Sequence, residues 1–114
     1  MADCIFCKIA SGEIKAELLY KDEQVVCFKD IKPAAPVHFL VIPVKHIPGP
    51  SDLKDLDREL LGRMFQAAAK VAEKLGAGKT GFRMVTNIGP DAGQEVPHIH
   101  IHVLGGRKFG WPPG

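Results

Sequence analysis

Residues 96–106 read Val96-Pro97-His98-Ile99-His100-Ile101-His102-Val103-Leu104-Gly105-Gly106, so histidine alternates with apolar residues through the middle of the run. Successive side chains of an extended strand point to opposite faces, which puts the three imidazoles on one face and the apolar groups on the other. Imidazole exchanges a proton near neutral pH and also acts as a nucleophile or a metal ligand. The alternation therefore predicts one strand face that packs in the core and one face that carries functional imidazoles. The alternative is a solvated face that is merely rich in histidine, although lysine, threonine or glutamate is more usual there.

Length and charge limit what the protein can be. The chain has 114 residues, 46% of them hydrophobic, which suits one ordinary core and is too short for two domains of typical size. We therefore expect one domain over residues 1–114. Fifteen basic and thirteen acidic side chains leave a formal charge of +2, far from the dense positive surface that nucleic-acid binding requires. We expect no nucleic-acid partner.

The sequence gives no sign of a membrane segment or a secretory leader. The longest apolar runs, residues 39–43 and 99–104, are too short to cross a bilayer. The start, Met1-Ala2-Asp3-Cys4, lacks a basic region followed by an apolar one. Three cysteines, an odd number, do not suggest a secreted disulfide framework. We expect a cytoplasmic protein whose cysteines are thiols or metal ligands, and no membrane partner.

The order of periodic segments predicts an α+β fold. A long helix is expected from an N-cap at Ser51, because apolar residues recur at helical spacing from Leu53 to Leu75, and it should end at Gly76. A short helical turn at residues 4–10 should precede it. Turn residues separate five expected strands, which are residues 18–20, 25–28, 38–43, 82–86 and 99–103.

A loop with two glycines, residues 87–94, runs directly into the histidine strand. Its backbone N–H groups could converge on a phosphate that faces the imidazoles. The alternative is an ordinary turn, in which glycine only supplies a positive φ angle. The adjacency of the loop to the histidines favours the phosphate interpretation.

Residues 98–104 resemble the His-φ-His-φ-His-φ-φ signature of the histidine triad (HIT) superfamily, in which φ is an apolar residue. Further blocks resemble the histidine triad nucleotide-binding (HINT) branch over nearly the whole chain. These blocks are Phe28-Lys29-Asp30-Ile31, Ala35-Pro36-Val37-His38-Phe39-Leu40-Val41-Ile42-Pro43, Gly93-Gln94, Leu104-Gly105-Gly106-Arg107 and Trp111-Pro112-Pro113-Gly114. A lone HxHxH motif is also typical of metal sites, whereas this ordered set is specific to the family.

The resemblance implies a purine nucleoside phosphoramidase that cleaves the P–N bond of adenosine 5′-monophosphoramidates and releases AMP, with GMP as a further candidate ligand. It also implies a homodimer that joins two five-stranded antiparallel sheets into one of ten strands, with residues 111–114 reaching towards the partner's active site. No cofactor is expected for the chemistry. Two alternatives remain: a nucleotide-dependent interaction protein with little turnover, and a dinucleotide hydrolase of the same superfamily.

The family's catalytic residues carry over by position. The resemblance implies that His100 attacks the α-phosphorus and forms a covalent nucleotidyl-histidine, which water then hydrolyses. His102 would stabilise charge on the nonbridging oxygens, and His38 and His98 would orient the nucleophile. His38 could instead be a strand-end residue satisfied by a carbonyl. The backbone donors to the phosphate would come from Gly93, Gln94, Glu95 and Val96.

Nucleotide contacts also follow from the resemblance. Asp30 would accept hydrogen bonds from the two ribose hydroxyls, and Asn87 would touch ribose or phosphate. Glu95 stands where well-known members carry a serine near the leaving amine, and it could donate a proton only in its protonated form. Lys29 occupies a position at the edge of the base. An apolar slot for the base, which ordinary core residues could equally form, would comprise Phe6, Ile9, Ile14, Phe28 and Ile31.

A second constellation begins at Cys4-Ile5-Phe6-Cys7. Two thiolates at this spacing form half of a tetrahedral zinc site, and His46 and His98 could complete a Cys₂His₂ shell, as in some bacterial superfamily members. The alternative is an ordinary thiol beside a small apolar side chain, and a redox CxxC lacks its usual surrounding βαβ pattern. We expect a structural zinc ion and place Cys27 in the core.

Overall fold

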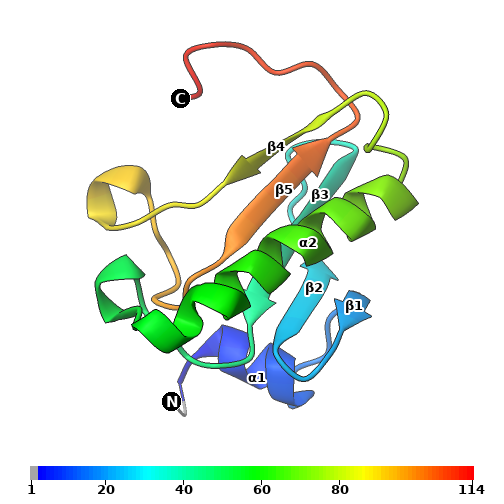
Figure 1. The fold of residues 1–114 in the computed structure, drawn as a ribbon. Coiled ribbons are helices and arrows are strands. Elements are labelled where there is room, and N and C mark those ends of the chain that lie inside the picture. Colours follow the sequence, from blue (N-terminus) through cyan, green and yellow to red (C-terminus); the bar gives the residue numbers. More distant parts are fainter. Residues whose placement is uncertain (1–2) are drawn as a thin grey trace.

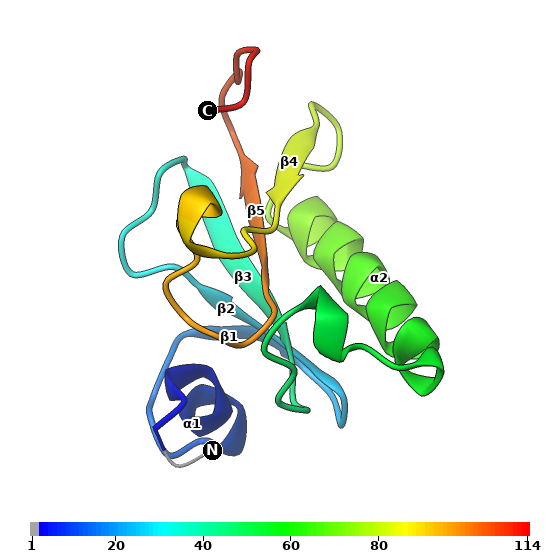
Figure 2. The same cartoon turned by 90° about the vertical axis from the view of Figure 1, so that its left-hand side faces the viewer.

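The computed structural model describes residues 3–114 as an antiparallel five-stranded sheet with one helix on each face (Figures 1 and 2). The strands lie in the order β1-β2-β3-β5-β4. The α+β class, the long helix and the five strands are thus confirmed. The elements are α1 (Ile5–Ser11), β1 (Leu18–Lys21), β2 (Val25–Lys29), β3 (Val37–Pro43), α2 (Arg58–Lys74), β4 (Phe82–Val85) and β5 (Ile101–Gly105).

Both faces of the sheet are buried at its centre, because alternate residues of β2 and β3 enter two different cores. The larger core lies under α2, which contributes Leu60, Met64, Ala68 and Val71. The smaller core lies on the opposite face under α1 (Figure 2). Its members are Phe6, Ile9, Ala10, Val26, Phe28, Leu40 and Ile42. The histidines therefore lie on the α1 side of the sheet.

β5 is shorter than the alternation predicts. The strand begins at Ile101 rather than Ile99, so His98 and His100 precede it. β4 ends at Val85, opposite His102, and therefore offers no further ladder partner. The Ile99 N–H group instead donates to the Ile47 carbonyl at 2.6 Å. Ile101 and Val103 enter the larger core as expected.

The long helix starts later than predicted. α2 begins at Arg58, not at an N-cap on Ser51, because residues 50–52 and 55–57 form two separate 3-10 turns. The buried Asp57 carboxylate closes the second turn by accepting the Lys54 N–H at 2.9 Å. It also accepts the Lys45 ammonium at 2.8 Å. Leu56 fits the helical spacing but is 73% exposed. The helix ends before Gly76, whose φ of 86° is left-handed as expected.

α1 begins directly after the first cysteine of the CxxC motif. Cys4 is its N-cap, and the Cys4 Sγ accepts the Cys7 N–H at 3.4 Å. Gly12 ends the helix with a φ of 86°. The expectation about a leader involves Met1 and Ala2, which lie outside the described residues. Within residues 3–114, no helix combines the length and the apolar character needed to cross a membrane.

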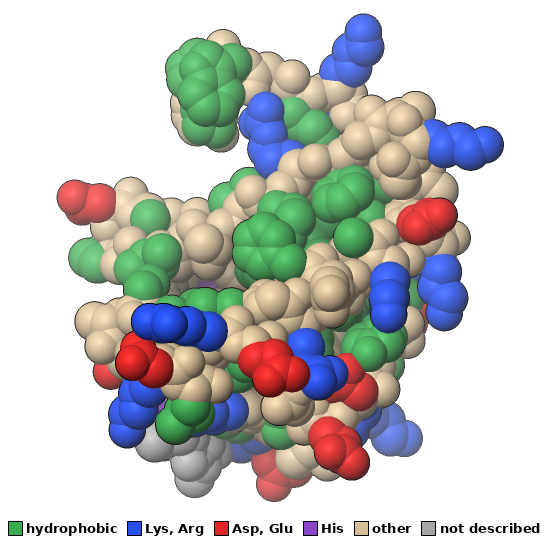
Figure 3. All heavy atoms as spheres, viewed as in Figure 1, with side chains coloured by type: hydrophobic (Ala, Val, Ile, Leu, Met, Phe, Trp, Pro, Cys, Tyr) green, Lys and Arg blue, Asp and Glu red, His purple; other side chains and the backbone are tan. Residues whose placement is uncertain are grey.

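Hydrophobic side chains also gather on the surface, over the middle of α2 and the neighbouring β4 (Figure 3). Phe65 of α2 is 59% exposed, and Phe82 and Met84 of β4 are half-buried. β4 is an edge strand, so one side of its ladder has no partner among residues 3–114 of the single chain.

Candidate active site

Backbone groups fix the ring of His100. Its Nδ1 lies 2.8 Å from the His98 carbonyl oxygen. A carbonyl can only accept, so Nδ1 carries the proton and Nε2 of the neutral ring keeps a lone pair. The His100 carbonyl in turn accepts from the Thr86 hydroxyl at 2.7 Å. The buried His100 therefore presents the nitrogen that a nucleophile requires.

His102 is held in the opposite tautomer. The Ala34 N–H donates to His38 Nδ1 at 2.9 Å, and an N–H group can only donate. The proton of the neutral His38 ring is therefore on Nε2, which lies 2.9 Å from His102 Nδ1. His102 accepts that proton's hydrogen bond and keeps its own proton on Nε2. The rings of His100 and His102, with centroids 5.2 Å apart, thus place a lone pair beside a donor.

Asp30 lies next to this hydrogen-bonded pair. Its Oδ2 is 3.4 Å from His38 Nε2 and 3.9 Å from His102 Nδ1. Its Oδ1 accepts the Lys32 N–H at 2.8 Å. The Asp30 carboxylate therefore borders the rings of His38 and His102, and its charge acts to raise the pKa of His102.

Burial is the main reason that the pKa of His102 is lowered below its ordinary value. The nearby His100 and His38 rings lower the pKa further, whereas the charges of Asp30 and Glu95 raise it. The net lowering keeps His102 neutral at neutral pH, which preserves the hydrogen-bonded chain from Ala34 through His38.

The side chain of Gln94 supports the glycine loop rather than facing outwards. Its Oε1 accepts the Gly89 N–H at 2.9 Å. Its Nε2 donates to the carbonyls of Pro48 at 3.1 Å and Val96 at 3.2 Å. Gly89 has a φ of 84°, a conformation in which a side chain would be strained.

Two of the four backbone N–H groups predicted to bind the phosphate already donate hydrogen bonds within the loop. The Gly93 N–H donates to the Pro90 carbonyl at 3.0 Å, and the Gln94 N–H donates to Gly89 at 3.1 Å. Within residues 3–114, the N–H groups of Glu95 and Val96 have no hydrogen-bond partner. Of the four expected backbone donors, the N–H groups of Glu95 and Val96 are therefore the two that are available to a phosphate.

The residues expected around the base occupy different environments. Phe6, Ile9 and Phe28 are buried in the smaller core, and Ile14 packs at its border. Ile31 is 93% exposed. Lys29 pairs with Glu17 at 2.9 Å, and Asn87 is half-buried at the start of the glycine loop. The structure thus brings four of the five apolar residues together and leaves Ile31 apart from them.

The four predicted metal ligands converge. The potential ligand atoms of Cys4, Cys7, His46 and His98 all lie within 4.8 Å of one another. His98 Nδ1 is 3.3 Å from Cys4 Sγ and 3.6 Å from Cys7 Sγ, and His46 Nδ1 is 3.3 Å from Cys7 Sγ. In a tetrahedral zinc site with ordinary bond lengths, neighbouring nitrogen and sulfur ligands are about 3.6 Å apart. The donor set and its spacing therefore fit zinc.

His98 serves this cluster through its ring. Its Nε2 donates to the Pro43 carbonyl at 2.8 Å, which leaves the Nδ1 lone pair facing the two thiols. Burial lowers the pKa of His98 and favours the neutral ring. His98 can therefore orient His100 only through its backbone carbonyl, not through the imidazole that the sequence suggested.

Sequence reasoning missed several groups that set this geometry. Thr86 supports the His100 carbonyl, and the main chain of Ala34 and Pro43 fixes two imidazoles. The sequence predicts Phe6 only as part of the base slot, whereas its ring also meets His100 edge-on, with centroids 5.0 Å apart. Thr86 could have been found from strand pairing, because it follows β4 opposite the histidine run.

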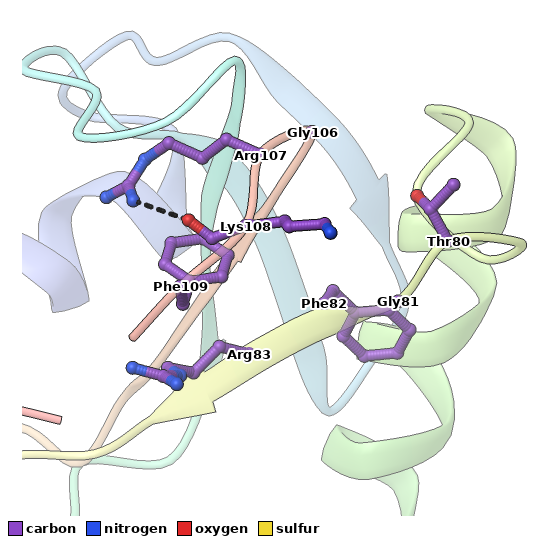
Figure 4. A pocket seen from close by; sticks show the side chains of 8 residues that line it. All are labelled: Thr80, Gly81, Phe82, Arg83, Gly106, Arg107, Lys108 and Phe109. Atoms are coloured by element: carbon purple, nitrogen blue, oxygen red, sulfur yellow. Dashed lines mark hydrogen bonds between the residues drawn. The ribbon is translucent and has the colours of Figure 1, made fainter. Parts of the chain in front are cut away.

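A large surface cavity without histidine in its lining lies at the β4 edge (Figure 4). It has a volume of about 820 Å³ and includes Arg83, Arg107 and Phe109 in its lining. The Phe109 ring lies between the two guanidinium groups, 5.1 Å from Arg83 and 4.3 Å from Arg107. Arg83 also donates to the Gly110 carbonyl at 2.9 Å, and Arg107 donates to Ala34. These arginines anchor the C-terminal segment.

Comparison with known proteins shows one family along most of the chain. The HIT domain model matches residues 11–109. A HIT-like protein of Synechocystis sp. is 48% identical over 112 residues, which cover 98% of this chain and 97% of that protein.

Solved structures agree in fold as well. A HIT family hydrolase of Legionella pneumophila is 48% identical, with a TM-score of 0.95 over 98% of this chain and 100% of the other. A HIT family hydrolase of Clostridium thermocellum is 44% identical, with a TM-score of 0.93 over 96% of each chain. A histidine triad protein of Clostridium difficile is 43% identical, with a TM-score of 0.92 over 96% of each chain. The match to the domain model, together with these similarities along the whole chain, shows that this chain belongs to the HIT domain family.

Proposed function

We propose that this protein hydrolyses the P–N bond of purine nucleoside 5′-monophosphoramidates through a nucleotidyl-histidine on His100. The observation that carries the proposal is the pair of opposite tautomers: a lone pair on His100 Nε2 beside a proton on His102 Nε2. Two similar structures are named HIT family hydrolases, which supports a hydrolytic reaction.

The reaction proceeds in two displacements. His100 Nε2 attacks the α-phosphorus, the P–N bond breaks, and the amine leaves with a proton. Water then attacks the same phosphorus, releases AMP and returns the lone pair to His100. Because the His100 ring is fixed, the first displacement is an attack by an oriented imidazole nitrogen rather than by water.

Charge on the phosphate is met by a small set of donors. The N–H groups of Glu95 and Val96 and the Nε2–H of His102 bind the nonbridging oxygens, where negative charge builds up during attack. The exposed Glu95 lies near enough to His102 for its charge to act on that ring, and in its protonated form it supplies the leaving amine's proton. Asp30 binds the ribose hydroxyls.

Cys4, Cys7, His46 and His98 would hold a zinc ion with a closed four-ligand shell. Such an ion would supply a structural cross-link, because no coordination position remains for water or substrate. The link joins the start of α1 to the segment after β3 and to the residue that precedes the triad strand. The nucleotide chemistry belongs to the chain's own residues.

The protein acts as a homodimer. The unpartnered β4 edge and the exposed hydrophobic surface over α2 (Figure 3) suit a second copy of the chain. Trp111, which is 83% exposed, directly follows Phe109 and Gly110, which the two arginines contact. This C-terminal segment reaches towards the partner's active site.

Turnover of an adenosine phosphoramidate tests the reaction. The parent protein should release AMP and amine, and it should carry an adenylated His100 when the reaction is quenched. His100→Ala should lose turnover by at least about 10⁴-fold and still bind AMP, because the phosphate loop and base slot remain. Near-normal turnover by this variant would exclude His100 as the nucleophile.

Two other outcomes would favour the alternatives. AMP binding by the parent without turnover would indicate a nucleotide-dependent interaction protein. Faster cleavage of a diadenosine polyphosphate than of the phosphoramidate would indicate a dinucleotide hydrolase.

A further inference from the structure

We infer that Cys4, Cys7 and His46 are positioning residues for the nucleophile, and that they act on His100 through His98. The inference rests on the proposed function, in which His100 is the nucleophile. It assigns the Cys–His cluster a role in the alignment of the active site in addition to its role in stability.

The first step of the argument is that His98 is held from both sides of its ring. Nδ1 faces Cys4 Sγ at 3.3 Å and Cys7 Sγ at 3.6 Å, and Nε2 donates to Pro43 at 2.8 Å. The ring is fully buried. It therefore cannot turn unless the cysteines or the Pro43 carbonyl release it.

The second step concerns the peptide that follows this ring. The His98 carbonyl takes the proton of His100 Nδ1 at 2.8 Å. The His98 N–H donates to Val96 at 2.8 Å, and the Ile99 N–H donates to Ile47 at 2.6 Å. Ile47 directly follows His46, so this hydrogen bond joins the segment that carries His46 to the segment that carries His98 and His100. The direction of the His98 carbonyl thus depends on both segments.

The third step is a side-chain contact that follows the same path. Phe6 lies between the two cysteines in the sequence, and it is buried. Its ring meets the His98 ring at 5.8 Å and the His100 ring at 5.0 Å, both edge-on. A displacement of the first turn of α1 would therefore move the packing surface of the nucleophile as well as its hydrogen-bond partner.

The consequence is a prediction about the His100 tautomer. If the cysteines are removed, the His98 ring keeps only its hydrogen bond to Pro43, and the His98 carbonyl is less firmly aimed at His100 Nδ1. The His100 ring then gains access to the tautomer with the proton on Nε2, which cannot attack phosphorus. Cys4 and His46 line one surface pocket together with Glu95 and Val96, but the proposed nucleotide contacts are made by other groups, the N–H groups of Glu95 and Val96, His102 and Asp30. Binding of AMP should therefore change much less than turnover.

Nitrogen-15 NMR of labelled histidines tests this coupling directly. The parent protein with zinc should show His100 protonated at Nδ1. The Cys4→Ser, Cys7→Ser double variant, and separately the parent after chelation, should show a mixture of the two tautomers. Turnover per site (kcat) should fall by on the order of tenfold, while the Kd for AMP changes by less than about twofold.

A matched control separates alignment from stability. Met64 is buried under α2 in the larger core, and Met64→Ala should lower the melting temperature by an amount comparable to the loss in the cysteine variant. Measured below its melting temperature, Met64→Ala should keep the parent's His100 tautomer and kcat.

The inference is overturned if the cysteine variant keeps a single Nδ1-protonated His100 and the parent's kcat. It is equally overturned if Met64→Ala shifts the tautomer as much. Failure of the proposed function is distinguishable: a parent protein that does not cleave the phosphoramidate would refute that proposal, and the tautomer measurement would still decide the coupling.

Discussion

Two clusters of imidazoles flank His100, and they use the same side chain in opposite ways. The cysteine cluster comprises Cys4, Cys7, His46 and His98, and the carboxylate cluster comprises Asp30, His38 and His102. Each brings its potential ligand atoms within 4.8 Å of one another. By proximity alone, both would be metal sites.

The two clusters differ in the backbone group that binds the other nitrogen of a key imidazole, His98 in one cluster and His38 in the other. The Pro43 carbonyl takes the Nε2 proton of His98, so the other nitrogen offers a lone pair to a metal. The Ala34 N–H occupies the Nδ1 lone pair of His38, so its Nε2 keeps a proton and donates it. A metal on His38 Nε2 would have to strip the ring of its last proton or break the bond to Ala34. The cysteine cluster therefore suits a metal ion, whereas the carboxylate cluster suits proton and charge chemistry.

The largest expected effect is on metal content. The protein, purified without chelators, should contain about one zinc ion per chain, and Cys4→Ser with Cys7→Ser should abolish it. His38→Ala should keep the full complement, because its ring faces no metal. Elemental analysis measures both. Zinc-free parent protein would contradict a metal site at the two cysteines. Loss of zinc from His38→Ala would contradict the conclusion that His38 holds no metal.

The next effect is on turnover. His102→Ala should slow phosphoramidate hydrolysis on the order of a hundredfold, as expected when one donor to developing charge is removed. His38→Ala should cost less, on the order of tenfold, because His38 acts through His102. His38→Gln can donate to His102 through its amide and should recover part of the loss. Equal losses in His38→Ala and His38→Gln would show that the hydrogen bond to His102 is unimportant.

The sheet and the histidine face could be predicted from the sequence because they depend on local alternation. Ile101 and Val103 enter the core, and the intervening histidine turns away from them, as two-residue periodicity requires. The helix start could not be predicted in the same way. Leu53 and Leu56 fit the helical spacing, but the Asp57 carboxylate closes a separate turn with Lys54.

The candidate site likewise has features that could be predicted from the sequence and features that could not. Its residue types follow from motif spacing, so the convergence of the two cysteines with His98 was expected. Its tautomers depend on carbonyl and N–H groups of unrelated segments, such as Pro43, which is 55 residues from His98 in the chain. No local pattern marks such a backbone group. The chemical difference between the two clusters is therefore visible only in the structure.

A smaller effect should appear in thiol reactivity. Burial, aided by the charge of Asp22, raises the pKa of Cys27 to about 12. Almost no reactive thiolate is then present at neutral pH. After chelation, iodoacetamide should label two thiols per native chain and label Cys27 only after unfolding. Mass spectrometry of the labelled peptides measures this, and rapid native labelling of Cys27 would contradict the closed larger core.

The smallest effect concerns the contribution of His102, in the carboxylate cluster, to the pH dependence of stability. Burial, with repulsion from His100 and His38, lowers the pKa of His102 in the folded protein, against the opposing charges of Asp30 and Glu95. As the pH falls below the ordinary histidine value of about 6.5, the unfolded chain therefore takes up a proton at this residue before the folded protein does. Stability that is present at neutral pH is thus lost on acidification.

His102→Gln removes this contribution and keeps a polar side chain. Between pH 7.5 and pH 5.5, its melting temperature should fall less than that of the parent, by a difference on the order of a degree or two. His98, whose pKa is also lowered by burial, is common to both proteins, so its effect cancels in the comparison. Identical pH dependence in the two proteins would mean that His102 takes up protons equally in its folded and unfolded states, and the neutral donor proposed for the phosphate would lose its physical basis.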